Sequence, residues 1–229
     1  MYGKYFNAVP LKRGPVLEID FGCRMGYGPG VSAKLWGDMG FRDVHFIEYS
    51  ADCLESVNAT KVTNSDLRFQ SSVNGNGPDR SHLPSNISPM YRYTIPGLGQ
   101  LQVSVHAGDQ SDMLLLEAVK HRALWLKKIS PRGFEFIIDD GGHENRQLLA
   151  SFFSLWPTVT SSGFYVLEDI AGAAYGFYDA PIIDGEGMEQ PGSMQYHVAE
   201  LLRGLFGFSE DAGIGLIECH YSICLLKKQ

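Results

Sequence analysis

The chain contains 229 residues, of which 44% are hydrophobic, and its formal net charge is −7 at pH 7. This length and apolar content predict one domain over residues 1–229 with its own core. The acidic charge, with no run of Lys and Arg longer than two residues, excludes a broad nucleic-acid or anionic-membrane surface. We therefore expect a small-molecule partner, no nucleic acid and no membrane, and the formation of a homo-oligomer stays open.

The N-terminal residues predict a cytoplasmic protein, and the cysteines predict free thiols. The sequence starts without a basic region followed by an apolar stretch, and no window reaches the roughly 18 apolar residues of a membrane span. Cys23, Cys53, Cys219 and Cys224 form no CxxC spacing, so neither a zinc site nor a disulfide framework is indicated. We expect four free thiols.

Five short apolar runs alternate with helical patterns. They span residues 15–20, 44–48, 101–106, 134–139 and 163–168. Such alternation predicts a parallel sheet covered by helices. The final stretch, "GLIECHYSICLLKK", contains two strands with almost nothing between them, and only an antiparallel pair is joined so tightly. We therefore expect one reversed strand in the sheet.

Helices are predicted by apolar spacing between these runs. One helix contains Val31, Leu35 and Met39 before Gly40; a second, capped by Ser111, contains Leu115, Val119 and Leu126; a third runs from Leu148 to Trp156 and ends at Pro157; a last one spans 198–205.

Two segments do not fit the alternation. Residues 60–99 are rich in Ser, Asn, Pro and Gly, which predicts a long insertion between the second helix and the third strand. Residues 171–193 follow the fifth strand and carry Tyr175, Phe177 and Tyr178. Since ligands in open α/β sheets bind beyond the carboxyl ends of the strands, this second segment is a candidate substrate lid; an ordinary surface loop is the alternative.

The first strand continues into a glycine-rich turn, "DFGCRMGYGPG" (20–30). Glycines at this place let the backbone approach a nucleotide-like cofactor at a helix start. The spacing does not match GxGxxG, because with Gly26 as the first glycine of the motif the third comes one residue early, at Gly30. This disfavours NAD and favours another adenosine cofactor, whose ribose hydroxyls Glu48 would bind at the end of the next strand.

The segment "HAGDQSD" follows the third strand. Asp109 is placed where a carboxylate would reach an adenine amino group. Alternatively, Asp109 and Ser111 are only turn and capping residues.

Carboxylates follow two predicted neighbouring strands. "FIIDDGGHENRQ" (136–147) places Asp139 at the end of the fourth strand, and Glu168 and Asp169 end the fifth. Three carboxylates this close repel one another unless a cation lies among them, and Mg²⁺ prefers hard oxygen ligands. Two glycines allow a turn that returns His143 to the same edge, while Asp140 is interpreted as a cap of the next helix, with metal ligation as the alternative.

The sequence resembles the class I S-adenosylmethionine-dependent methyltransferases over most of its length. "LEIDFGCRMGYGPGVSAKLW" is similar to the glycine motif of a fungal group of them. "FIIDDGGHENRQ" and "FSLWPTVTSSGFYVLEDI" resemble metal-dependent sugar and natural-product O-methyltransferases with a DDGxH motif. The resemblance implies a Rossmann-like α/β fold: a mostly parallel seven-stranded sheet with one antiparallel strand and helices on both faces.

The resemblance also implies roles for individual residues. S-adenosyl-L-methionine would be bound by Glu18, Gly22, Gly26, Gly28, Glu48, Asp109, Gln110 and Asp139. Mg²⁺, or another divalent cation, would be held by Asp139, Glu168 and Asp169. The catalytic residues would be His143, as general base, and Asp139.

We therefore predict a Mg²⁺-assisted O-methyltransferase of secondary metabolism that acts on a small hydroxylated metabolite. One alternative is a catalytically inactive protein of the same fold that binds the cofactor and serves an interaction role; the long 60–99 segment and Asp20, where most members have glycine, motivate it. A non-haem iron oxygenase would need a second histidine, for which His106 is the candidate. A NAD-dependent dehydrogenase is disfavoured by the glycine spacing.

Overall fold

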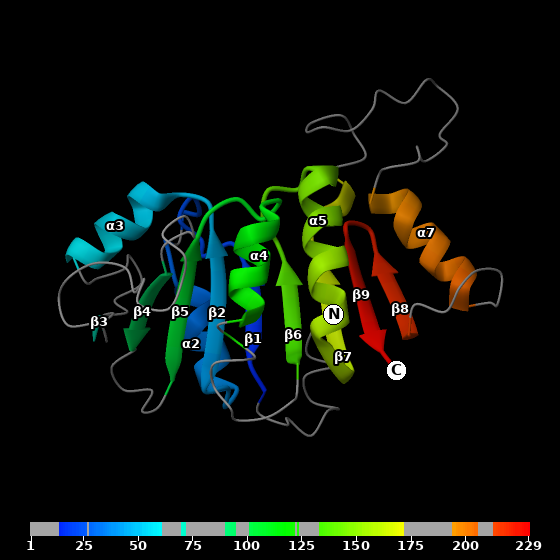
Figure 1. The fold of residues 1–229 in the computed structure, drawn as a ribbon, viewed down its shortest axis with the longest axis horizontal. Helices are drawn as coiled ribbons and strands as arrows, with labels where there is room; N and C mark the ends of the chain where they lie inside the picture. The colour runs from blue at the N-terminus through cyan, green and yellow to red at the C-terminus, as the bar shows by residue number, and fades with distance from the viewer. Residues whose placement is uncertain are drawn as a thin grey trace.

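The computed structural model describes residues 14–26, 28–60, 70–71, 90–94, 101–121, 123, 133–171, 194–205 and 213–229. These residues form a nine-stranded sheet with helices packed on it (Figure 1). The strands lie in the order β3-β4-β5-β2-β1-β6-β7-β9-β8. Their bounds are Val16–Ile19 (β1), Asp43–Glu48 (β2), Gln70–Ser71 (β3), Met90–Thr94 (β4), Gln102–Ala107 (β5), Phe134–Asp139 (β6), Val159–Leu167 (β7), Ile214–His220 (β8) and Ile223–Lys228 (β9).

Five strands in the middle of the sheet, β5, β2, β1, β6 and β7, run parallel to one another. Strand β9 is antiparallel to both β7 and β8. The predicted parallel sheet and its reversed strand are thus confirmed. The described sheet has two strands beyond the expected seven, because β3 and β4, in the segment interpreted as an insertion, extend the β5 edge as antiparallel strands.

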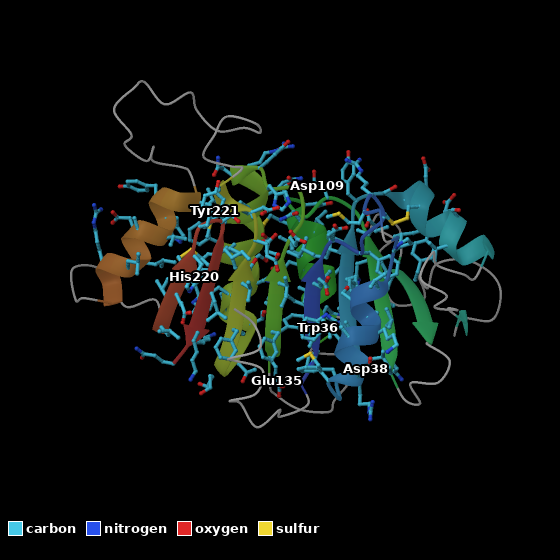
Figure 2. All side chains as sticks on the ribbon, turned by 180° about the vertical axis from the view of Figure 1, so that it is seen from behind. Trp36, Asp38, Asp109, Glu135, His220 and Tyr221 are labelled. Carbon is cyan, nitrogen blue, oxygen red and sulfur yellow. A yellow bond between two sulfur atoms is a disulfide. The ribbon has the colours of Figure 1, made fainter. Side chains whose placement is uncertain are left out.

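Two apolar layers cover the sheet. On one face, α2 (Val31–Asp38) and α3 (Ala51–Thr60) bury Trp36 and Leu54 against Phe46 and Phe136 of the strands. On the other face lie α4 (Met113–Lys120), α5 (Asn145–Leu155) and α7 (Met194–Leu205). Figure 1 shows α4 and α5 in front of the sheet, and Figure 2, seen from behind, shows α2 with Trp36 on the opposite side. Both faces are thus buried, as a parallel sheet requires.

The helix ends follow local chemistry, with two corrections to the predicted caps. Asp112, and not Ser111, caps α4, since its side chain accepts a hydrogen bond from the Leu114 N–H. The N-cap of α5 is Glu144, so Asp140 does not cap this helix. After α5, a 3₁₀ turn (η2, Trp156–Thr158) contains Pro157, which confirms that proline as the predicted end.

The prediction of free thiols is wrong. Cys23 is bonded to Cys53, and Cys219 to Cys224. The first pair is 30 residues apart in sequence, and its sulfurs meet because the loop after β1 lies beside the first turn of α3. The second pair joins the facing ends of β8 and β9, where the two cysteines are opposite each other in the strand register.

In the described part of the chain, no helix is long and apolar enough to cross a membrane. The cytoplasmic location and the single domain stay predictions. The candidate lid, apart from Ala171 at its start, lies outside the described residues.

Candidate functional site

A cavity of about 390 Å³ opens at the carboxyl ends of β1, β2 and β5. Its walls include Asp20, Glu48, Tyr49, Asp109, Gln110 and Gly142. Ligands bind at this edge in open α/β sheets, where the strand order reverses on either side of β1. Among the residues predicted to bind the cofactor, Glu48, Asp109 and Gln110 line this cavity, whereas Glu18, Gly22, Gly26, Gly28 and Asp139 are not among its lining residues.

Glu48 is held rigidly at the end of β2. Its carboxylate accepts hydrogen bonds from the Ser50 N–H at 2.7 Å and the Phe21 N–H at 3.3 Å. Burial raises the pKa of Glu48, and the neighbouring Asp20 carboxylate raises it further. A fixed carboxylate at this place suits a ribose diol, and ribose binding by Glu48 stays a prediction.

Glu18, in β1, and Asp20, directly after β1, place two carboxyl groups at the start of the glycine turn. Glu18 accepts a hydrogen bond from the Trp36 indole at 2.6 Å, and burial raises its pKa to about 7. Asp20 lines the cavity, and its carboxylate accepts a hydrogen bond from the Gly22 N–H at 2.7 Å. Asp20 therefore stabilises the glycine turn while placing a carboxylate in the cavity, which the sequence motif did not predict as a binding group.

Asp109 lies in the opposite wall. Partial burial pulls its pKa upward, but hydrogen bonds from the Ser111 N–H, the Ser111 hydroxyl and the Gln147 amide outweigh burial and hold its pKa below the usual value. The carboxylate stays ionised and oriented. The turn role and the proposed adenine contact are compatible, since Asp109 both closes the turn and lines the cavity.

Asp139 is the last residue of β6 and is fully buried. Its carboxylate accepts hydrogen bonds from Gln110 Nε2 and the Tyr165 hydroxyl, both at 2.9 Å, and from the Ser151 hydroxyl. Burial raises the pKa of Asp139 and raises that of Tyr165 well above its usual value. Both oxygens of Asp139 are therefore engaged inside the protein.

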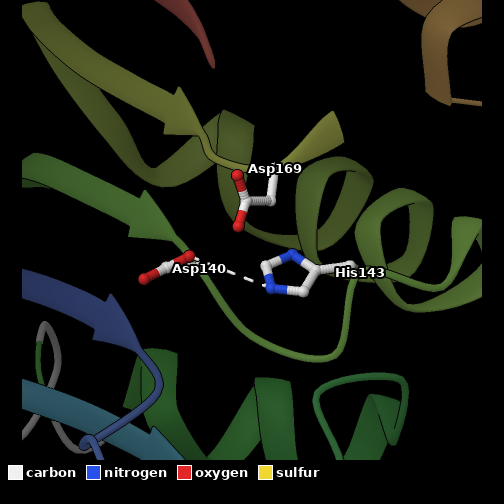
Figure 3. A group of neighbouring side chains, drawn as sticks. All are labelled: Asp140, His143 and Asp169. Carbon is white, nitrogen blue, oxygen red and sulfur yellow. Dashed lines mark ion pairs between the residues drawn. The ribbon is translucent and has the colours of Figure 1, made fainter. Parts of the chain in front are cut away.

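The next carboxylate, Asp140, lies at the mouth with His143 and Asp169 (Figure 3). Each of the three residues offers a ligand atom, and these atoms all lie within 4.8 Å of one another. Asp140 Oδ1 is 3.9 Å from His143 Nε2. Burial, together with Asp20, Asp169 and Asp139, raises the pKa of Asp140 to about 7. The two carboxylate oxygens are ligands that Mg²⁺ prefers, and the imidazole nitrogen of His143 lies beside them.

Backbone hydrogen bonds between neighbouring strand ends assemble this cluster. The Asp140 N–H donates to the Ile19 carbonyl at 3.2 Å, and the Glu168 N–H donates to the Asp139 carbonyl at 2.9 Å. Glu168 thus lies beside the cluster. Burial raises the pKa of Glu168, and the neighbouring Asp169 carboxylate raises it further. The strand ends therefore bring Asp139, Glu168 and Asp169 close, as predicted, but the atoms that converge belong to Asp140, His143 and Asp169.

Backbone strain gathers at the same place. Among the described residues, five that are not glycine have positive φ, and three of them are Asp20 (φ 96°), His143 (φ 58°) and Asp169 (φ 49°). Such conformations are costly, and proteins keep them mostly at functional sites. The loops are therefore bent where their side chains face the cavity and the cluster.

His106 does not join the cluster. It is fully buried, stacks on His45, and its Nε2 is 3.0 Å from His45 Nδ1. In the described residues the cluster thus contains one histidine, whereas the non-haem iron pattern needs two. The oxygenase alternative loses its second ligand.

The sheet order, the reversed β9 and the cavity at the carboxyl edge together define the fold of the class I methyltransferases. MycE, a methyltransferase from the mycinamycin biosynthetic pathway solved in complex with Mg, SAH and mycinamycin VI, matches this chain with a TM-score of 0.65 and 20% identity. The match covers 99% of this chain and 48% of MycE. The predicted resemblance is confirmed at the level of the fold.

Two curated relatives match a shorter stretch. Mycinamicin VI 2''-O-methyltransferase of Micromonospora griseorubida is 35% identical over 71 residues, which are 31% of this chain and 16% of the relative. Demethylmacrocin O-methyltransferase of Streptomyces fradiae is 35% identical over 69 residues, 30% of this chain and 15% of the relative. No family model matches. The chain spans about half the length of MycE.

Proposed function

We propose that the chain is an S-adenosylmethionine-dependent O-methyltransferase that acts, with a divalent cation, on a small hydroxylated metabolite. The observation that carries this proposal is the loop after β6. It lines the cavity through Gly141 and Gly142 and carries Asp140 and His143 to the cluster beside it. A cofactor site and a cation site thus share one loop.

The cavity fits an adenosine cofactor. Glu48 presents a fixed carboxylate for the ribose, and Asp109 an ionised one for the adenine amino group. S-adenosylmethionine, when bound, supplies a methyl group on a cationic sulfur, which suits a cavity lined by several carboxylates. MycE, solved with Mg and SAH, supports this choice.

The cluster fits Mg²⁺, with Asp140 and Asp169 as oxygen ligands and Glu168 next to them. Asp140 takes the place given to Asp139 on the sequence alone, because Asp139 is already engaged by three donors. Bound Mg²⁺ supplies positive charge that lowers the pKa of an acceptor hydroxyl. His143 accepts the hydroxyl proton as that oxygen attacks the methyl carbon and the carbon–sulfur bond breaks toward sulfur.

The relatives define the acceptor class to test first. Both curated matches are named as O-methyltransferases, one of mycinamicin VI and one of demethylmacrocin. We propose a hydroxyl of a sugar or another natural product as the acceptor, with residues 171–193 as the lid that selects it.

The first experiment is calorimetric titration of the protein with S-adenosylhomocysteine, followed by transfer of labelled methyl from S-adenosylmethionine to a panel of sugar and phenol acceptors. We expect binding with or without EDTA, and transfer only with Mg²⁺. His143→Asn should keep binding and lose transfer by at least about a hundredfold. No binding under either condition would overturn the proposal.

A second candidate is a cofactor-binding protein without turnover. The strained Asp20, whose carboxylate lies in the cavity near Glu48, favours it. Binding of S-adenosylhomocysteine without transfer to any acceptor, in the wild type and in Asp20→Gly, would decide for this candidate.

A further inference from the structure

The buried carboxylate of Asp139 acts on the loop that follows it. Its oxygens are shared between two groups of donors: Oδ2 accepts from the hydroxyls of Tyr165 and Ser151, and Oδ1 accepts from Gln110 Nε2 at 2.9 Å. These hydrogen bonds offset part of the cost of burying the carboxylate. A bond from Oδ1 therefore reaches across the sheet, from β6 to the turn after β5.

Gln110 carries this link onward. Its Oε1 accepts a hydrogen bond from the Gly142 N–H at 2.8 Å, and the side chain is nearly fully buried. The amide has a single suitable orientation, because its NH₂ must face the Asp139 carboxylate and its oxygen must face the Gly142 N–H. Asp139 thus sets the direction in which Gln110 presents its acceptor.

The loop backbone lies directly on this amide. A Cβ added at Gly141 would lie 1.9 Å from Gln110 Oε1, so only glycine allows the close approach. The same loop carries Asp140 on one side and His143 on the other. Its position therefore depends on where the Gln110 amide is held.

We infer that Asp139 is a positioning residue: through the Gln110 amide it fixes the loop that presents Asp140 and His143, and it is not itself a metal ligand. The roles of Asp140 and His143 rest on the proposed function. The hydrogen-bonded chain from Asp139 to Gly142 stands on the geometry alone.

An exchange of the two side chains tests this inference sharply. In Asp139→Asn/Gln110→Glu, the asparagine NH₂ donates to the new carboxylate, which still accepts from the Gly142 N–H, and the asparagine oxygen still accepts from Tyr165 and Ser151. Every hydrogen bond is kept, and only the bond between residues 139 and 110 changes direction, with residue 139 now the donor. Gln110→Glu alone places two carboxylates face to face, and Gln110→Leu removes both bonds.

Two measurements follow the loop and the metal separately. The exchange rate of the Gly142 amide proton, measured by NMR, reports its hydrogen bond to residue 110. Mn²⁺ binding, measured by electron paramagnetic resonance, reports the cluster. In Gln110→Leu we expect exchange to accelerate, and Mn²⁺ affinity to fall, by at least about tenfold. Asp139→Asn, whose side-chain oxygen still accepts from Gln110 Nε2, and the exchanged pair should both stay within about threefold of the wild type in both measurements. The control Asp140→Asn should lose Mn²⁺ affinity and keep Gly142 protected.

The outcomes separate the possible roles. If Asp139→Asn loses as much Mn²⁺ affinity as Asp140→Asn and the exchanged pair does not restore it, Asp139 is a ligand and the inference fails. It also fails if Gly142 exchanges at the wild-type rate in Gln110→Leu. If the wild type itself binds no Mn²⁺, the metal part of the proposed function is lost, and the Gly142 exchange rates still decide whether the Gln110 link holds the loop.

Discussion

The sulfurs of Cys23 and Cys53 join the glycine turn after β1 to the first turn of α3, with the two Cα atoms 6.0 Å apart. Both segments lead away from the cavity, since Asp20 precedes the first and Glu48 the second. The disulfide therefore clamps together the two loops proposed to hold the cofactor.

Removal of this clamp should lower both stability and cofactor affinity. A bond closing a 30-residue separation contributes about 3 to 4 kcal/mol in the chain-entropy model. Cys23→Ser/Cys53→Ser should therefore unfold at lower urea and bind S-adenosylhomocysteine more weakly.

Cys219→Ser/Cys224→Ser is the matched control. It opens a separation of five residues, for which the same model gives about 2 kcal/mol, and should leave S-adenosylhomocysteine affinity unchanged. An oxidised and a reduced wild type with equal urea midpoints would contradict the clamp.

The two glycine turns should respond differently to an added methyl group. In Gly141→Ala the new Cβ meets Gln110 Oε1 at 1.9 Å and Ile19 Cγ2 at 2.8 Å. We expect a loss of about 1 to 3 kcal/mol from overpacking, measured by urea unfolding. Gly26→Ala meets nothing within 4 Å and should change stability by less than about 0.5 kcal/mol. Equal stability of the two variants would show that the loop does not rest on Gln110.

Glu18 should make the protein less stable as the pH rises. Its pKa in the folded protein is about 7, above the ordinary 4.5, because of burial. The folded protein therefore binds this proton more tightly than the unfolded chain, and the stabilisation is complete below pH 4.5 and is lost between pH 4.5 and about 7.

Glu18→Gln keeps an acceptor for the Trp36 indole and cannot ionise. Its stability relative to the wild type should increase from pH 5 to pH 8 by on the order of 2 kcal/mol, a value reduced because Glu18 as a whole residue is only partly buried. Thermal unfolding across this range measures the difference. The exposed Asp38, paired with Lys34, supplies the control Asp38→Asn, which should follow the wild-type pH profile. Parallel curves for Glu18→Gln and the wild type would refute the assignment.

The sequence predicted the parts of the fold that depend on periodicity. Apolar runs such as 134–139 are buried on both faces, so they identify the parallel strands without tertiary information. Strands β3 and β4 lie in a segment whose polar composition resembles a loop, and β4 is a strand through its pairing with β5 and β3. The disulfide between Cys23 and Cys53 depends on the sheet order, which places the loops after β1 and β2 side by side.

The site shows a finer limit. The sequence alone does not show which of the adjacent carboxylates, Asp139 or Asp140, points into the protein, because this depends on where strand β6 ends. Asp139, still within β6, enters the layer that contains Tyr165 and Ser151, whereas Asp140, one residue later, faces the mouth. That difference comes from side-chain alternation at the end of a strand, whose last residue no pattern fixes to within one position.

Asp169→Asn should separate two effects of the carboxylate cluster on stability: charge repulsion in the metal-free protein and stabilisation by bound Mg²⁺. Burial raises the pKa of Glu168 and of Asp140, and the negative charge of Asp169 raises both further. Removing this charge relieves repulsion and should stabilise the metal-free protein. Asparagine tolerates the positive φ at this position. With Mg²⁺ the order should reverse, because the wild type gains about 2.7 kcal/mol at a hundredfold excess over its Kd and the variant gains far less. Thermal midpoints in EDTA and in Mg²⁺ measure both effects.

Glu117→Gln, on the surface of α4 beside Lys120, is the control and should respond to Mg²⁺ as the wild type does. Equal Mg²⁺ responses in Asp169→Asn and the wild type would remove Asp169 from the metal site.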